Sequence, residues 1–174
     1  MKKIIYLHGY GSSNKSIKSI ELKQYFDVLC PNIPIKYDEA FKFLTIYLKD
    51  KTDYILVGTS LGGYWAGVMS ELFHIPAVLI NPSCDPQSTL INYKNENLDE
   101  IELSKYKSLS LTNAIPRIVL LAKDDNIIDY KIAETRLSPI SDVKLFDTGG
   151  HRFNDINKIS FYINELSNTT FYIP

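Results

Sequence analysis

The chain alternates between short apolar runs and longer amphipathic stretches along its whole length. Six apolar runs have the length and the β-branched content of buried strands: residues 2–7, 28–30, 53–58, 77–81, 117–122 and 143–146. Five stretches carry apolar residues at helical spacing: 15–26, 38–49, 61–73, 130–136 and 155–166. Because strands that are apolar throughout alternate with helices, the pattern predicts an α/β fold whose mostly parallel sheet is covered by helices on both faces.

One stretch interrupts this alternation. Residues 85–113 are polar, rich in Asn, Lys, Glu and Ser, and form a connection longer than is usual between strands. The stretch fits one crossover helix with an irregular surface loop, or a short lid over a site, and the two interpretations overlap. No repeat or Gly/Ser linker divides the sequence, so we expect one domain over residues 1–174.

Composition and charge exclude several classes of protein. The 174 residues are 45% hydrophobic and 22% charged, which suits a folded domain with a sizeable core. Lys and Arg number 19 against 20 Asp and Glu, a net charge of −1, so we expect neither nucleic acid nor a membrane surface as a partner. No apolar run approaches the roughly 20 residues that a membrane-spanning helix needs.

The N-terminus and the cysteines bear on location and on metal binding. Two lysines precede the apolar residues 4–7, but His8 follows too early for the about 7–15 apolar residues of a signal peptide. We therefore expect a cytoplasmic protein, in which Cys30 and Cys84 are two thiols, with a disulfide between them as the alternative. There is no CxxC and no Cys/His cluster, so the sequence suggests no metal and no cofactor.

The strongest chemical signal is the G-x-S-x-G pattern of residues 58–62. It follows an apolar strand and opens a helix, which is the context of a nucleophilic serine on a tight turn. Glycines two residues to either side of Ser60 relieve the crowding at such a turn. The alternative is a structural Gly-rich turn with an inert serine. The backbone N–H of Leu61 would point to where an oxyanion forms, helped by the start of the helix.

A second Gly-rich loop, His-Gly-Tyr-Gly at residues 8–11, follows the first expected strand. A loop at this place can present a further oxyanion donor, and its position favours the backbone N–H of Tyr10. We interpret His8 as a residue that holds the loop by hydrogen bonding rather than as a proton shuttle. A phosphate-binding turn is disfavoured because GxGxxG and the Lys-Ser/Thr pair are missing.

A general base for Ser60 must come from three histidines. His74 stands at the end of a helix just before Ile75-Pro76 and is interpreted as structural. His151 follows Gly149-Gly150 after the last expected strand, where the glycines leave the loop free to direct its ring. His151 would take the proton of Ser60 and return it to the leaving group.

A carboxylate should orient His151, and the aspartates after the fifth expected strand are the main candidates. Asp124 and Asp125 are adjacent, so only one of them can point toward the histidine. We favour Asp125. Asp129 comes next but also fits the N-cap of the following helix, and Asp147 is a weaker alternative. The order serine, aspartate, histidine is that of the α/β-hydrolases.

These motifs resemble the α/β-hydrolase superfamily and, more closely, its small YqiA-like bacterial esterases. The matching segments are YLHGYGSS at 6–13, VGTSLGGYWA at 57–66, PAVLINPS at 76–83, DDNIIDY at 124–130 and GGH at 149–151. The resemblance implies a six-stranded, mostly parallel sheet in the order 2-1-3-4-5-6, without a large cap domain. It also places Asp125 on the aspartate of the family's G-D-x-V/I-L pattern, with Asp124 on its glycine.

The residues and the resemblance together predict a serine esterase that hydrolyses small, short-chain carboxylic esters or thioesters. Ser60, Asp125 and His151 would be catalytic, and the N–H groups of Tyr10 and Leu61 would form the oxyanion hole. The expected partner is a small-molecule ester. Two alternatives remain: an acyltransferase or perhydrolase that uses the same serine, and a non-catalytic binding module on a hydrolase scaffold.

Overall fold

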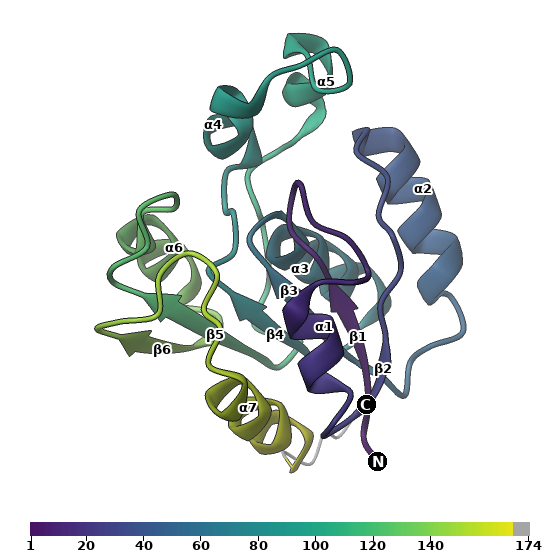
Figure 1. The fold of residues 1–174 in the computed structure, drawn as a ribbon, viewed down its shortest axis with the longest axis vertical. Helices are drawn as coiled ribbons and strands as arrows, with labels where there is room; N and C mark the ends of the chain where they lie inside the picture. Colours follow the sequence, from purple (N-terminus) through teal and green to yellow (C-terminus); the bar gives the residue numbers. More distant parts are fainter. Residues whose placement is uncertain (169–174) are drawn as a thin grey trace.

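A computed structural model describes residues 1–168 and is built around one six-stranded sheet (Figure 1). The strands lie in the order β2-β1-β3-β4-β5-β6, and every neighbouring pair is parallel. Their bounds are β1 Lys3–Leu7, β2 Asp27–Leu29, β3 Ile55–Thr59, β4 Ala77–Ile80, β5 Arg117–Ala122 and β6 Asp142–Phe146. The fold class expected from the sequence and the strand order implied by the resemblance are thus confirmed.

The central strands β1, β3, β4 and β5 are buried on both faces, which explains their unbroken apolar sequences. Side chains alternate between the faces along each strand. In β1, Ile5 and Leu7 belong to one apolar core, whereas Ile4 and Tyr6 belong to the core on the opposite face. The sheet therefore separates two cores, and each needs its own layer of helices.

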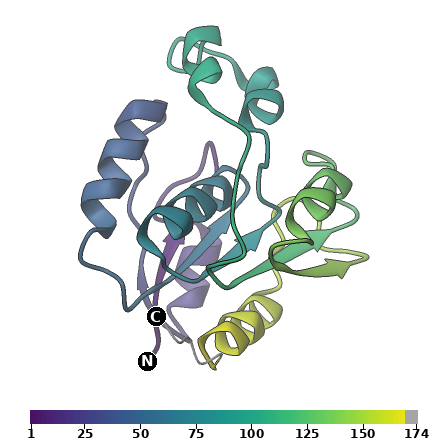
Figure 2. The ribbon, with the colours of Figure 1, turned by 180° about the vertical axis from the view of Figure 1, so that it is seen from behind.

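Helices cover both faces of the sheet (Figures 1 and 2). Helices α1 (Ile17–Leu22) and α7 (Ile156–Asn168) cover one face, and α2 (Tyr37–Leu48), α3 (Leu61–Phe73) and α6 (Tyr130–Leu137) cover the other. Helix α7 buries Ile159, Ile163 and Leu166, which share one face at spacings of four and three residues. None of the helices within residues 1–168 combines the length and the apolar character that crossing a bilayer requires.

The segment 85–113 lies beyond the carboxyl ends of the strands, at the top of Figure 1. It contains two short helices, α4 (Pro86–Leu90) and α5 (Glu100–Lys105), where the sequence suggested one crossover helix. Pro86 at the first turn starts α4, and the Asp99 side chain accepts the N–H of Glu102 at 2.8 Å to cap α5. The part of the chain described here contains no large cap domain, as expected.

A buried arginine fixes the point where this segment returns to the sheet. Arg117, at the start of β5, donates to Ser70 Oγ at 2.9 Å and to the Thr112 carbonyl at 2.8 Å. Its guanidinium also pairs with Glu71 of α3 at 2.5 Å, and the Arg117 side chain is 0% exposed. The segment is therefore tied to α3 by a hydrogen-bonded ion pair.

Two helices begin or end differently from the expectation. Helix α1 is shorter than residues 15–26, because Ser16 caps its start and the N–H groups of residues 23–25 bond three residues back in turns. Helix α2 begins at Tyr37, one residue before the predicted start at residue 38, with Lys36 at its N-cap, and the N–H of Tyr37 donates to the carboxylate of Glu102. Long-range contact and turn geometry thus decide these two boundaries.

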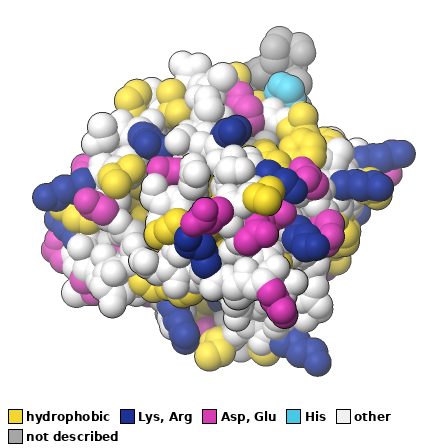
Figure 3. Space-filling view, turned by 90° about the horizontal axis from the view of Figure 1, so that it is seen from above, with side chains coloured by type: hydrophobic (Ala, Val, Ile, Leu, Met, Phe, Trp, Pro, Cys, Tyr) yellow, Lys and Arg dark blue, Asp and Glu magenta, His cyan; other side chains and the backbone are white. Residues whose placement is uncertain are grey.

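The surface seen from above carries charges of both signs, interspersed with small apolar spots (Figure 3). This distribution agrees with the net charge of −1. It gives this face no broad field of one sign.

Candidate active site

Ser60 lies at the turn between β3 and α3. Its backbone has φ 58° and ψ −121°, a region that residues other than glycine rarely occupy. Its N–H donates to the Ile80 carbonyl at 3.0 Å, and its carbonyl accepts the N–H of Ser83 at 3.1 Å. The turn is therefore held from the β4 side, close to where the strand order reverses between β1 and β3.

The glycines around Ser60 are required by close approaches of the backbone. A Cβ at Gly58 would lie 2.1 Å from the Gly62 carbonyl oxygen, and a Cβ at Gly62 would lie 2.0 Å from the Leu7 oxygen. These distances exclude any side chain at either position. The pattern G-x-S-x-G is thus explained by the packing of the turn and the first turn of α3 against β1.

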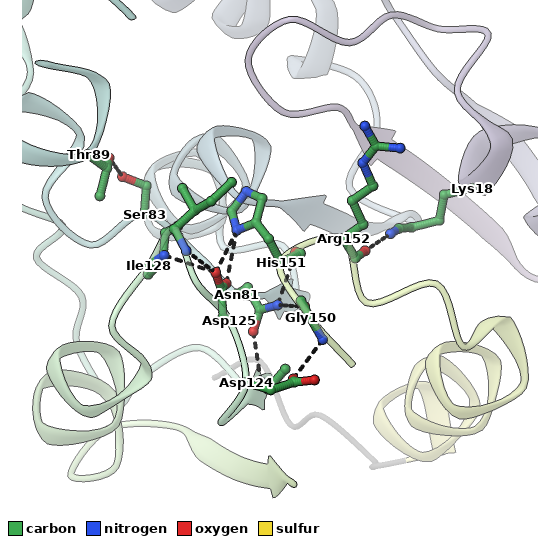
Figure 4. Close-up of polar contacts among 12 residues, drawn as sticks. Lys18, Asn81, Ser83, Thr89, Asp124, Asp125, Ile128, Gly150, His151 and Arg152 are labelled. Atoms are coloured by element: carbon green, nitrogen blue, oxygen red, sulfur yellow. Dashed lines mark hydrogen bonds and ion pairs between the residues drawn. The ribbon is translucent and has the colours of Figure 1, made fainter. Parts of the chain in front are cut away.

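The ring of His151 faces the carboxylate of Asp125 (Figure 4). Its Nδ1 lies 2.9 Å from Oδ2 and 3.1 Å from Oδ1 of Asp125. Oδ1 also accepts the N–H groups of Ile127 at 2.8 Å and Ile128 at 2.9 Å, and the Asp125 side chain is 1% exposed. A carboxylate held in this way places the proton of the neutral ring on Nδ1, so Nε2 is free to accept one.

Two further side chains hold the loop that carries His151 (Figure 4). The Asn81 amide, at the end of β4, donates to the carbonyl oxygens of Gly150 at 2.9 Å and His151 at 3.1 Å. Its Oδ1 accepts the N–H of Ala122 at 2.9 Å. Asp124 accepts the N–H of Gly150 at 2.7 Å. The adjacent aspartates therefore both act on this loop, Asp125 on the ring and Asp124 on the backbone.

Ser60 and His151 line the same two cavities. One, of about 370 Å³, extends from these residues to the start of α1; the other, of about 220 Å³, is lined by Leu61, Ser83, Leu90 and Ile128 among others. The Ser60 hydroxyl makes no hydrogen bond within residues 1–168. A hydrogen bond between a catalytic serine and its histidine often forms or tightens only when substrate is bound.

The loop at residues 8–11 lies against Ser60. A Cβ at Gly9 would be 3.2 Å from the Thr59 carbonyl oxygen and 3.8 Å from Ser60 Oγ, so glycine allows this approach. Tyr10 lines both cavities, and Leu61 lines the smaller one. Neither the Tyr10 N–H nor the Leu61 N–H has a hydrogen-bond partner in the part of the chain that the structure describes. Both donors are therefore available to a ligand.

His8 has the structural contacts that the sequence suggested. Its Nδ1 lies 3.0 Å from the Gly9 carbonyl oxygen, and its Nε2 accepts the N–H of Ile33 at 3.1 Å. Burial lowers the pKa of His8, because a charged ring would lose solvation. The neutral ring thus links the 8–11 loop to the segment after β2.

The other candidate aspartates have different partners. Asp129 is the N-cap of α6 and accepts the N–H of Lys131 at 3.0 Å. Asp147 pairs with Lys123 at 2.7 Å on the surface. Of the four candidates, the structure brings Asp125 to the ring of His151.

Metal-ligating side chains do not gather in the described part of the chain: no group of three or more His, Cys, Asp or Glu could hold an ion there. Cys30 and Cys84 are free thiols, and burial raises the pKa of each to about 11. Both thiols therefore stay protonated near neutral pH.

Residues 3–167 match the model of a protein family described as "Uncharacterised protein family (UPF0227)". The chain belongs to the UPF0227 family. A UPF0227 protein from Shewanella woodyi is 26% identical over 164 residues, which cover 86% of this chain and 90% of that protein.

Solved structures show that this UPF0227 chain has the fold of the α/β-hydrolases, as the resemblance implied. Alpha/beta hydrolase domain-containing protein 10 from mouse matches with a TM-score of 0.77 and 17% identity, covering 95% of this chain and 89% of that one. The Pyrococcus furiosus esterase Pf2001 matches with a TM-score of 0.71 and 18% identity, covering 95% and 81%. At these identities the comparisons establish the fold alone.

Sequence reasoning missed Asn81 in this member of the family. The sequence signal for Asn81 is a polar residue directly after the apolar run 77–80. In the structure Asn81 has φ 40°, a conformation that asparagine tolerates better than most residues. Lys18 was also missed, because a lysine in an amphipathic helix reads as a solvent-exposed residue. It is 5% exposed and donates to Arg152 and Phe153, whose positions no local pattern reveals.

Proposed function

We propose that this protein is a serine hydrolase that cleaves small carboxylic esters or thioesters. Ser60 is the nucleophile, His151 the general base and Asp125 the group that orients the histidine. The observation that carries the proposal is the bond from His151 Nδ1 to the buried Asp125 carboxylate, 2.9 Å long, beside a serine with φ 58° in the same cavities. A buried carboxylate on Nδ1 of the histidine and a strained serine lining the same cavities support a serine–histidine–carboxylate triad.

In the first half of the reaction, Ser60 Oγ attacks the ester carbonyl carbon while its proton passes to His151 Nε2. The carbonyl oxygen takes the negative charge of the tetrahedral intermediate. The carbon–oxygen bond to the alcohol then breaks, and the His151 proton goes to the leaving alkoxide. The products of this half are the free alcohol and an acyl-Ser60 ester.

In the second half, water attacks the acyl carbon and gives a proton to His151 Nε2. The bond to Ser60 Oγ breaks, and the histidine returns its proton to the serine. The net reaction consumes one ester and one water and yields one acid and one alcohol. These steps need no metal ion and no cofactor.

The N–H groups of Tyr10 and Leu61 would stabilise the oxyanion. Both residues line the cavity that contains Ser60, and Leu61 is the first residue of α3, where the helix dipole favours negative charge. Donors without a partner in the folded chain are suited to this task because they need no rearrangement during the reaction.

The segment 85–113 would form a short lid over the smaller cavity. Tyr10 and Tyr93 approach with ring centroids 5.6 Å apart, and Asn95 donates to the Tyr10 hydroxyl at 2.8 Å. Thr89, Leu90 and Tyr93 of this segment line the cavity of about 220 Å³. A space of this size suits short acyl chains, so we expect acetate to butyrate esters to react faster than laurate.

The test is hydrolysis of 4-nitrophenyl esters of rising chain length by the wild type, Ser60→Ala and Ser104→Ala. Ser104 is an exposed serine on α5, which makes it a matched control. The proposal requires turnover by the wild type and by Ser104→Ala, with Ser60→Ala at background. Equal rates for all three proteins would reject Ser60 as the nucleophile, and a maximum at ten carbons or more would reject the chain-length expectation.

A further inference from the structure

The larger of the two cavities beside Ser60 has cationic walls. Lys15, Lys18 and Arg152 line it together with Ser60 and His151, and its lining contains no Asp or Glu. A cavity of about 370 Å³ exceeds what a short alkyl chain would fill. The charge and the size of the cavity therefore both suit a polar or charged ligand group better than a plain hydrocarbon chain.

Lys18 is the buried part of this wall and is 5% exposed. Its Nζ donates to the backbone carbonyl oxygen of Arg152 (Figure 4). It also donates to the carbonyl oxygen of Phe153 at 3.2 Å and to Asn154 Oδ1 at 3.4 Å. Burial and the charge of Arg152 lower its pKa to about 8, and Glu21 opposes this shift weakly. No carboxylate pairs with Lys18 in residues 1–168.

Arg152 follows His151 directly and lines both cavities. In Figure 4 its guanidinium points to the same side of the loop as the His151 ring. Among the residues described, it forms no ion pair and donates no hydrogen bond. A guanidinium presents a fixed fork of donors that matches a carboxylate or a phosphate. Its neighbour Lys18 adds a positive charge that no carboxylate within residues 1–168 pairs with, and this favours an anion beside the two.

We propose that this cavity binds an anionic group carried by one arm of the substrate, so that the protein prefers esters with a terminal carboxylate or phosphate. Arg152 would bind the anion directly, with Lys15 and Lys18 contributing positive potential. The inference names the substrate class of the proposed serine hydrolase and rests on it for turnover, but anion binding can be measured without turnover. Arg152 and Lys18 are then specificity-determining residues and take no part in bond breaking.

Kinetics on matched substrates test the preference. For the acyl arm, the 4-nitrophenyl monoester of glutaric acid, which carries a terminal carboxylate, is compared with the neutral 4-nitrophenyl pentanoate. For the alcohol arm, 4-(butyryloxy)benzoate and 4-(butyryloxy)phenyl phosphate are each compared with methyl 4-(butyryloxy)benzoate. We expect the kcat/KM of at least one anionic ester to exceed that of its neutral match about tenfold, chiefly through a lower KM. A tenfold gain in binding is what one charge-assisted hydrogen bond can supply.

The variant Arg152→Gln should reduce that ratio toward one. Lys42→Gln is the matched control, because Lys42 is exposed on α2 and lines neither cavity, and it should keep the wild-type ratio. Equal use of anionic and neutral esters by the wild type would overturn the inference, as would a preference that survives Arg152→Gln.

Binding to Ser60→Ala separates this inference from the proposed function. Glutarate and its neutral diamide are titrated into the variant and followed by NMR, and only glutarate should bind, with affinity lost in Ser60→Ala/Arg152→Gln. Glutarate binding without hydrolysis of any ester would support the anion site and reject the esterase. Hydrolysis of neutral esters with no anion preference and no glutarate binding would support the esterase and reject the anion site.

Discussion

At the scale of single residues, the hydrogen bonds of Asp125 separate its role from those of its neighbours. Its carboxylate accepts the N–H groups of Ile127 and Ile128 and faces His151 Nδ1. Asp124 and Asp129 instead accept backbone N–H groups of Gly150 and Lys131. An asparagine can still accept those N–H bonds at either of these two positions. At residue 125 it would place an amide donor against the ring and favour the wrong tautomer.

Asp125→Asn should therefore lower kcat on a short ester by roughly 10²–10⁴-fold while the fold stays intact. Asp124→Asn and Asp129→Asn are the matched controls, and each should cost less than about tenfold, below roughly 1.4 kcal/mol of barrier. Steady-state kinetics on 4-nitrophenyl butyrate and circular dichroism measure both properties. Loss of activity in Asp129→Asn, with Asp125→Asn active, would require a different carboxylate partner for the histidine.

Asn81 provides a second prediction at this scale. Asn81→Asp keeps the shape and tolerates φ 40°, but replaces the donor to Gly150 and His151 with a buried carboxylate facing their carbonyl oxygens. We expect a loss of about 1–3 kcal/mol of unfolding free energy and a fall in kcat larger than the change in KM. Chemical denaturation and kinetics measure these. If kcat is unaffected, Asn81 does not position the loop for catalysis.

At the scale of elements, the return of segment 85–113 to the sheet depends on Arg117. Removing the guanidinium takes the donor from Ser70 Oγ and the ionic partner from Glu71, which is 31% exposed and keeps its hydrogen bonds from Thr112. Arg117→Met should therefore lower the free energy of unfolding by about 2–3 kcal/mol, less than for a fully buried pair. The control Arg136→Met removes an exposed arginine whose one hydrogen bond within residues 1–168 goes to the Cys84 carbonyl, and should cost under about 1 kcal/mol. Urea denaturation compares the two, and equal losses would contradict the account of this clamp.

At the scale of the whole molecule, His8 should make stability depend on pH. Because burial lowers its pKa in the folded state, the unfolded chain binds more protons as the pH falls below 6.5. The contribution of neutral His8 is fully present above pH 6.5 and is lost as the pH falls from there through the lower pKa of the folded state. His8→Gln keeps a donor and an acceptor but cannot titrate, so its free energy of unfolding should fall less over this range. Denaturation at pH 7.5, 6.5 and 5.5 compares the two proteins, and parallel curves would exclude His8.

Much of this architecture is present in the sequence. The apolar strand runs predicted the sheet because both of its faces are buried, and the G-x-S-x-G pattern located the Ser60 turn because Gly58 and Gly62 have no room for a Cβ. The 85–113 helices, the cap of α2 and the contacts of Lys18 were not predictable. Each depends on partners distant in the sequence, such as Glu102 for Tyr37 and Arg152 for Lys18. The cationic cavity became visible only when α1 and the His151 loop were placed together.

The central claim is that Ser60 is a nucleophile activated by His151. The most direct test is reaction with a fluorophosphonate, followed by intact mass and peptide mapping, because only a serine beside a base reacts readily. We expect one adduct, on the peptide containing Ser60, that is absent in Ser60→Ala and forms much more slowly in Asp125→Asn. An unmodified wild type, or labelling that persists in Ser60→Ala, would contradict the account.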